Sequence, residues 1–124
     1  MACFFLGLCA LKVSFIGPPP VPPTMTPVVA PVVTRPPPLT FSALPPIWQC
    51  IAWHESTDNS LAINPISGDA GAFQISQYMW DVYRSSSDPW WIPSASLEQQ
   101  YQVAQAIQSK WGWSQWETAP LCGV

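Results

Sequence analysis

The chain carries little charge and few of the groups that bind nucleic acid. Only 9% of its 124 residues are charged, with four basic residues and one histidine. Residues 47–124 contain two of the bases and all seven acids, which gives them a formal charge of −5. This balance excludes a basic surface that follows a phosphate backbone, and it excludes adhesion to an anionic membrane by charge. We therefore expect no nucleic-acid partner.

Motifs for metal and phosphate binding are also missing. The four cysteines form no Cys-x-x-Cys pair, the histidine forms no His-x-x-x-His pair, and no glycine-rich phosphate loop is present. We expect no metal ion and no cofactor. The uninterrupted apolar run over residues 1–11 is too short to span a bilayer.

The first 46 residues differ in composition from the rest, because they hold 12 of the 16 prolines and no acid. Residues 1–17 are apolar, which favours an export signal over an uncleaved hydrophobic tail. Residues 18–46 predict a disordered, extended linker, since proline fixes φ and removes backbone donors. A docking site for a proline-binding domain is the competing interpretation. Residues 47–124 then form one small domain.

The pattern of residues 47–124 predicts a mainly α-helical fold. Pro46 suits the first position of a helix whose apolar face ends in Glu55. Residues 57–72 are rich in turn formers and predict a loop or short irregular hairpin. A second helix is expected over residues 76–83.

The last helix has the strongest signals. Ser96 and Gln99 fit a capping box at its start, and Gly112 suits its end. Its expected apolar face consists of Leu97, Tyr101, Ala104, Ile107 and Trp111.

Glu55 is the candidate catalytic residue. A carboxyl group near Trp48 and Trp53 is poorly hydrated, so we expect its pKa to be raised. A carboxyl that is still protonated near neutral pH can donate its proton to the oxygen of a glycosidic bond. Taken alone, a glutamate at a helix end is more often a solvated surface residue.

The order of several short motifs resembles the lysozyme-like transglycosylases, and most of all the catalytic domain of resuscitation-promoting factors. The similarity covers residues 47–124. The matching blocks are Glu55-Ser56, Asn64, Gly-Asp-Ala-Gly-Ala-Phe-Gln-Ile-Ser at 68–76, Trp80, Glu-Gln-Gln at 98–100, Gly-Trp-Ser-Gln-Trp at 112–116, and Cys122. The resemblance implies an α-rich (α+β) lysozyme-like fold. It also implies that Glu55 is a catalytic acid in a groove that binds peptidoglycan.

Four residues are candidates for substrate binding: Gln74, Asn64, Tyr78 and Trp91. The amide of Gln74 suits either a bond to an acetamido group of the substrate or support of the loop backbone near Glu55. Tyr78 is expected to line the groove, and Trp91 suits either the core or stacking on a sugar ring. His54 lies about 100° from Glu55 around the helix and is expected to be a partly exposed structural residue.

Cys50 and Cys122 are expected to form a disulfide, since small exported domains are commonly stabilised in this way. Two buried free thiols are the alternative. In the family that the chain resembles, the first cysteine lies directly before the catalytic glutamate. Here it lies one helical turn earlier, and the longer tail before Cys122 compensates for this change.

The mechanism depends on how many carboxyl groups take part in catalysis. Asp58 and Asp69 lie in turn-forming sequence and are expected to be structural. Glu55 would then act alone, with the N-acetyl group of the substrate stabilising the sugar cation. Attack by water gives hydrolysis, and attack by the 6-hydroxyl of the sugar gives an anhydro product. The sequence leaves both open.

The sequence therefore predicts a secreted or cell-wall-associated glycosidase. Its expected substrate is the MurNAc–GlcNAc β-1,4 bond of a peptidoglycan glycan strand, and it is expected to act as a monomer. The alternatives are a non-catalytic peptidoglycan-binding module on a proline stalk and a purely structural domain.

Overall fold

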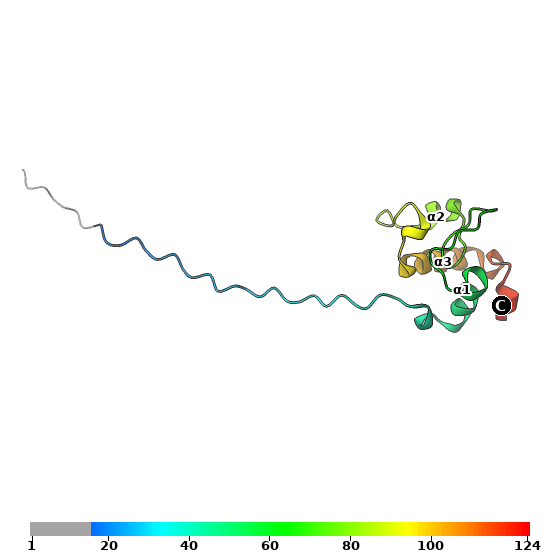
Figure 1. Ribbon diagram of the computed structural model, residues 1–124, viewed down its shortest axis with the longest axis horizontal. Helices are drawn as coiled ribbons and strands as arrows, with labels where there is room; N and C mark the ends of the chain where they lie inside the picture. Colours follow the sequence, from blue (N-terminus) through cyan, green and yellow to red (C-terminus); the bar gives the residue numbers. More distant parts are fainter. Residues whose placement is uncertain (1–15) are drawn as a thin grey trace, which may run out of the picture. The chain divides into compact units, whose positions relative to one another are not determined.

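The computed structural model describes residues 16–124, so the apolar segment predicted over residues 1–17 lies almost entirely outside it. The chain divides into two compact units between Thr34 and Arg35. Within the first unit, residues 16–34 contain no helix or strand, their side chains are exposed, and their trace is extended (Figure 1). The domain divisions at residues 17 and 46 remain predictions.

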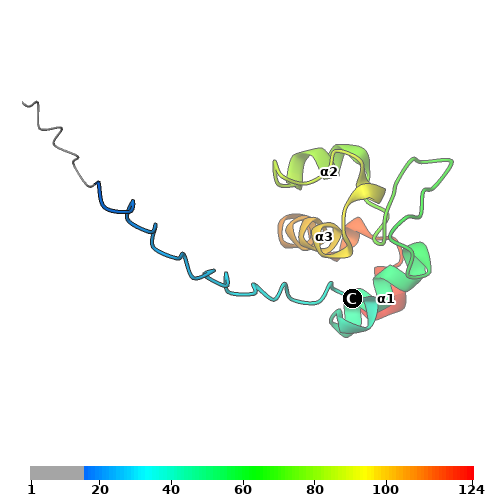
Figure 2. The same cartoon turned by 60° about the vertical axis from the view of Figure 1, so that its left-hand side comes forward.

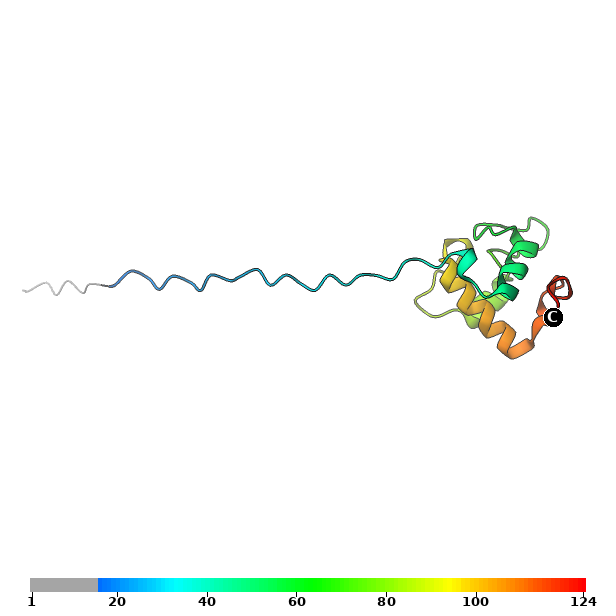
Figure 3. The ribbon, with the colours of Figure 1, turned by 90° about the horizontal axis from the view of Figure 1, so that it is seen from below.

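The second unit is mainly helical, as the sequence predicts. Its helices are α1 (Pro46–Ser56), α2 (Gln77–Tyr83) and α3 (Leu97–Trp111), with short 3₁₀ helices η1 (Phe41–Ala43), η2 (Ile92–Ser94), η3 (Trp113–Gln115) and η4 (Ala119–Cys122). α3 packs against α2, while the C-terminal segment follows α3 and turns back so that η4 contacts α1 (Figures 2 and 3). Between α1 and α2, the loop contains two isolated β-bridges, Ile63–Ala70 and Ala70–Ile75.

The helix boundaries follow from local sequence. Pro46 occupies the first turn of α1, where its missing N–H costs no hydrogen bond, and Thr57 ends the helix in a left-handed conformation. The predicted capping box of α3 is confirmed. Ser96 Oγ accepts from the backbone N–H of Gln99, and Gln99 Oε1 accepts from the backbone N–H of Ser96.

The core is built around Trp48 of α1. Its ring lies edge-on to Phe73, Tyr101 and Trp116, with centroid distances of 5.4, 5.5 and 5.3 Å. Edge-to-face contacts at this spacing are favourable for aromatic pairs. Leu44 lies N-terminal to α1, in the segment assigned to the linker, and it is buried in this core. Trp48 therefore joins α1, the loop, α3 and the C-terminal segment into one packing unit.

The most deeply buried polar side chain belongs to Gln100 on α3. Its Oε1 accepts from the backbone N–H of Ala72 at 2.8 Å. Its Nε2 donates to the carbonyl oxygens of Ser60, Ile92 and Ala95 at 3.0–3.1 Å. One fully buried amide thus fixes both ends of the loop between α1 and α2 to α3, and this loop forms one wall of the site described below.

We expect Gln100→Met to lower the free energy of unfolding by about 3 kcal/mol, because a methionine of similar size leaves buried backbone groups without partners. Urea unfolding measures the loss. Gln102→Met is the matched control, since Gln102 is exposed on the same helix and its replacement should leave stability nearly unchanged. Equal stability of the two variants would contradict the assigned role.

The predicted disulfide between Cys50 and Cys122 is confirmed, with a Cα–Cα distance of 5.7 Å. It joins α1 to η4 across 72 residues of sequence. Among residues 16–124, no helix is long and apolar enough to cross a membrane.

Candidate active site

Glu55 lies in the last turn of α1, where its side chain is half-buried. Thr118, which precedes η4, donates a hydrogen bond from its hydroxyl to Glu55 Oε1 at 2.6 Å. Burial is the largest influence on this carboxyl and raises its pKa above the ordinary value of 4.5. Nearby negative charges on Asp69 and Glu117 raise it further, whereas the Thr118 hydrogen bond and His54 oppose the rise.

Glu55 opens onto a cleft of about 430 Å³. This volume falls in the range of small-ligand sites. The lining comes from α1, the loop between α1 and α2, and the C-terminal segment: Glu55, Asn64, Ser67, Asp69, Gln74, Gln115, Trp116, Glu117 and Thr118. It includes three carboxyl groups and no lysine or arginine.

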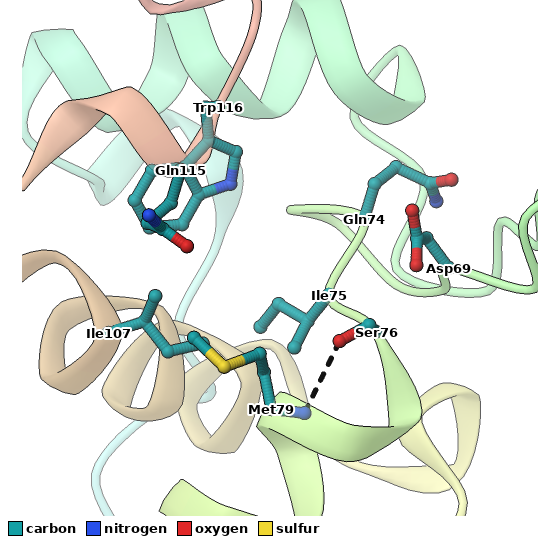
Figure 4. Close-up of a pocket in the computed structure, with 8 residues that line it drawn as sticks. All are labelled: Asp69, Gln74, Ile75, Ser76, Met79, Ile107, Gln115 and Trp116. Atoms are coloured by element: carbon teal, nitrogen blue, oxygen red, sulfur yellow. Dashed lines mark hydrogen bonds between the residues drawn. The ribbon is translucent and has the colours of Figure 1, made fainter. Parts of the chain in front are cut away.

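A side pocket of about 140 Å³ continues the cleft toward α2 and α3. Figure 4 shows Gln115 and Trp116 on one side of this pocket, with Asp69 and Gln74 on the other. These four residues also line the cleft. The side pocket and the cleft are therefore neighbours, and only the cleft is lined by Glu55.

Hydrogen bonds within the loop hold the wall that faces Glu55. Ser56 Oγ donates to the carbonyl oxygen of Ala72 at 2.8 Å and fixes this wall to α1. Gly71 has φ +83°, and a Cβ there would lie 2.5 Å from Gln100 Oε1. Glycine is required at this position on both grounds.

Two predicted substrate-binding residues, Gln74 and Asn64, line the cleft. Gln74 Nε2 donates to the carbonyl oxygen of Gly71 at 2.9 Å, so the amide supports the loop, which is one of its two expected roles. Asn64 Oδ1 accepts from the backbone N–H groups of Ile66 and Ser67 and shapes the turn. Contact of either residue with a substrate remains a prediction.

The structure does not bring Tyr78 and Trp91 to this cleft. The Tyr78 side chain is 74% exposed, and Trp91 is half-buried beside Trp90 with ring centroids 5.7 Å apart. Neither is among the lining residues. Their part in binding substrate stays a prediction.

Sequence reasoning missed Thr118 and treated Asp69 as a turn residue. Asp69 is half-buried and lines both spaces, while the turn around it is held by its backbone and by Ser67. Asp58, by contrast, is exposed and does not line the cleft. No short-range pattern marks Thr118, because it meets Glu55 across 63 residues of sequence.

A group of potential metal ligands lies beside the site. Ligand atoms of Cys50, His54 and Cys122 lie within 4.8 Å of one another. Both sulfur atoms are bonded in the disulfide, which removes the thiolates that a metal ion would need. His54 is exposed and is not among the cleft residues, in line with the expected helix geometry.

Comparison with known proteins points to one family. The family model described as "Transglycosylase-like domain" matches residues 42–119. The chain is 36% identical over 87 residues to "Lysozyme 2" of Lucilia sericata, covering 60% of this chain and 61% of that protein. It is 30% identical over 91 residues to "Lysozyme 1" of Musca domestica, covering 62% and 63%. The chain thus spans about three fifths of the length of these relatives. As its sequence motifs predict, it belongs to the transglycosylase-like domain family.

Proposed function

We propose that the chain cleaves the MurNAc–GlcNAc β-1,4 bond of peptidoglycan, with Glu55 as general acid and then general base. The observation that carries this proposal is the half-buried Glu55 carboxyl on a 430 Å³ cleft, with its pKa raised chiefly by burial. A raised pKa keeps a carboxylic acid protonated at pH values where an exposed one has lost its proton. Membership of the transglycosylase-like domain family supports the same chemistry.

In the first step, protonated Glu55 donates its proton to the glycosidic oxygen as the bond from this oxygen to the anomeric carbon breaks. The sugar left behind develops the charge of an oxocarbenium ion. Two groups can stabilise this positive charge. One is the Asp69 carboxylate, which lines the same cleft, and the other is the substrate's own N-acetyl group. Glu55, now ionised, takes a proton from water or from the 6-hydroxyl of the sugar as that oxygen attacks.

The charge of the cleft supports a neutral glycan as ligand. Its lining contains Glu55, Asp69 and Glu117 but no basic residue. A site for phosphate groups needs positive charge or a cluster of backbone donors, whereas sugar hydroxyl and acetamido groups bond to amides and carboxylates. Trp116 is buried and contributes only an edge of its indole to the lining, so the polar side chains of the cleft carry most of the expected contacts with the sugar.

Incubation of the full chain with purified peptidoglycan tests the proposal. We expect release of soluble muropeptides, and mass spectrometry of their ends identifies the second step. A reducing end indicates attack by water, and a 1,6-anhydro end, lighter by one water molecule, indicates attack by the 6-hydroxyl. Binding to sedimented wall without release would instead support a non-catalytic binding module.

The location and biological role belong to the same proposal. We infer that the protein acts outside the cytoplasm, secreted or associated with the cell wall, as a monomer on single glycan strands. The Cys50–Cys122 disulfide supports this location, because such bonds persist in oxidising compartments. A role as a resuscitation-promoting factor remains a prediction from the sequence motifs.

The charge of Asp69 predicts a pH effect. Because this charge raises the pKa of Glu55, Asp69→Asn should lower that pKa and move the alkaline limb of the pH–rate profile to lower pH. Rates of muropeptide release across the pH range measure the shift. Asp58→Asn is the control, since it removes an exposed carboxylate outside the cleft and should leave the limb in place. If the alkaline limbs of the Asp69→Asn variant and the native chain coincide, the charge of Asp69 does not raise the pKa of Glu55.

A further inference from the structure

We propose that Thr118 is a positioning residue for Glu55 and that the Cys50–Cys122 disulfide holds it in place. The inference deepens the proposed function and rests on it. Thr118 and Glu55 are 63 residues apart in sequence, yet the hydroxyl lies 2.6 Å from the carboxylate oxygen Oε1. Both residues line the cleft.

The backbone around Thr118 is fixed on both sides. Ala119 is buried in the core, and its N–H donates to the carbonyl oxygen of Trp116 at 3.0 Å. The carbonyl oxygen of Thr118 accepts from the N–H of Leu121 at 2.9 Å. These contacts fix the backbone position from which the threonine hydroxyl reaches the carboxyl.

The disulfide adds a covalent link between the same two segments. Cys122 follows Thr118 by four residues, and Cys50 precedes Glu55 by five residues on α1. The bridge therefore lies close to the Thr118–Glu55 contact in both segments. α1 and η4 also contact each other directly. The covalent link holds η4, and the Thr118 backbone before it, against α1.

The hydrogen bond gives the two carboxyl oxygens different roles. Thr118 bonds to Oε1, and among residues 16–124 no hydrogen-bond partner of Oε2 is found. When Glu55 is protonated, the hydroxyl continues to donate to Oε1 and the proton is left on Oε2. Thr118 thus selects the oxygen that presents the proton to the glycosidic bond.

The same bond limits how far the pKa of Glu55 rises. A hydroxyl that donates to a carboxylate favours the ionised form, which is the form needed in the second step. It opposes burial and the negative charges of Asp69 and Glu117, and His54 acts in the same direction as Thr118. Thr118 therefore helps the carboxyl to serve as acid and then as base.

The test compares Thr118→Val, which keeps the branched shape and removes the hydroxyl, with Thr118→Ser, which keeps the hydroxyl. Titration of the ¹³C-labelled glutamate carboxyls of the full chain by NMR reports the pKa of Glu55 directly. The chain has only three glutamates, and Glu55→Gln identifies the signal. We expect the pKa to rise in the valine variant and to stay at its native value in the serine variant.

Activity gives a second readout. On purified peptidoglycan, Thr118→Val should lower kcat/KM about tenfold at acidic pH, as expected for loss of a hydrogen bond to a charged group. The loss should shrink along the alkaline limb, because the higher pKa keeps more Glu55 protonated. The serine variant should follow the native profile at every pH. A role in folding alone would lower activity equally across the pH range.

The outcomes separate the two proposals. An unchanged Glu55 pKa in Thr118→Val overturns the positioning role, even if the native chain cleaves peptidoglycan. A native chain that releases no muropeptides overturns the proposed function, while the titration still decides whether Thr118 holds the carboxyl. If the valine variant does not fold, Thr118→Ala gives the same comparison with the serine variant.

Discussion

Glu55→Gln should reduce the release of muropeptides by roughly a thousandfold, within the range for loss of a general acid. The amide of glutamine has nearly the same shape as the carboxyl, and its oxygen still accepts the hydrogen bond from Thr118. It can neither hand a proton to the glycosidic oxygen nor accept one from the attacking hydroxyl. The variant therefore removes the chemistry and keeps the cleft. Initial rates on purified peptidoglycan measure the loss.

The matched control is Glu98→Gln, an exposed glutamate in the first turn of α3, whose rate should equal that of the native chain. A Glu55→Gln variant with native activity would rule out the catalytic role of Glu55.

The stability of the Glu55→Gln variant provides a further check. Because the pKa of Glu55 is raised in the folded state, its contribution to stability declines as pH rises from 4.5 to that raised value. The glutamine variant avoids this decline, so at neutral pH it should unfold no more easily than the native chain.

Replacement of both cysteines, Cys50→Ser together with Cys122→Ser, should lower the free energy of unfolding by roughly 4 kcal/mol. The chain-entropy model gives this value for a loop of 72 residues, since the bridge restricts the unfolded chain. Small domains are stabilised by only about 5–15 kcal/mol in total, so the loss is a large part of the whole. Urea unfolding at neutral pH measures it.

Reduction gives the control for this prediction. A thiol reductant should lower the stability of the native chain by a similar amount and leave the double variant unchanged. Proteolytic mapping before and after reduction identifies the peptide pair that contains Cys50 and Cys122. A native chain whose unfolding curve does not respond to full reduction would contradict the proposed stabilisation.

Local signals predicted the helices well, because helix ends depend on neighbouring residues. The capping box of Ser96 and Gln99 is an example. The predicted apolar face of α3 was only partly correct. Trp111 is 53% exposed, and its indole N–H donates a hydrogen bond to the Tyr83 hydroxyl. Gln100 is instead buried in the core. A polar residue becomes a core residue only when distant backbone groups satisfy its amide, and periodicity carries no information on such groups.

The site residues likewise fall into two groups, those that the sequence could identify and those that it could not. Glu55 and Gln74 could be found from motif spacing, because the helix and the loop after it are close in sequence. Asp69 could not be assigned to the cleft, since its residue type suits a turn equally well and only the loop conformation decides where the side chain lies. Thr118 required the fold itself, because the disulfide and η4 bring the C-terminal segment back to α1.

Trp116 gives the cleft an intrinsic fluorescent probe. Its indole is buried, donates to the carbonyl oxygen of Phe73 at 3.0 Å and lines both the cleft and the side pocket. The rings of Trp48 and Trp113 lie 5.3 and 6.1 Å away, close enough for excitation to pass between the three indoles. A glycan fragment that enters the cleft changes the surroundings of this group, so tryptophan emission can report occupancy without any attached dye.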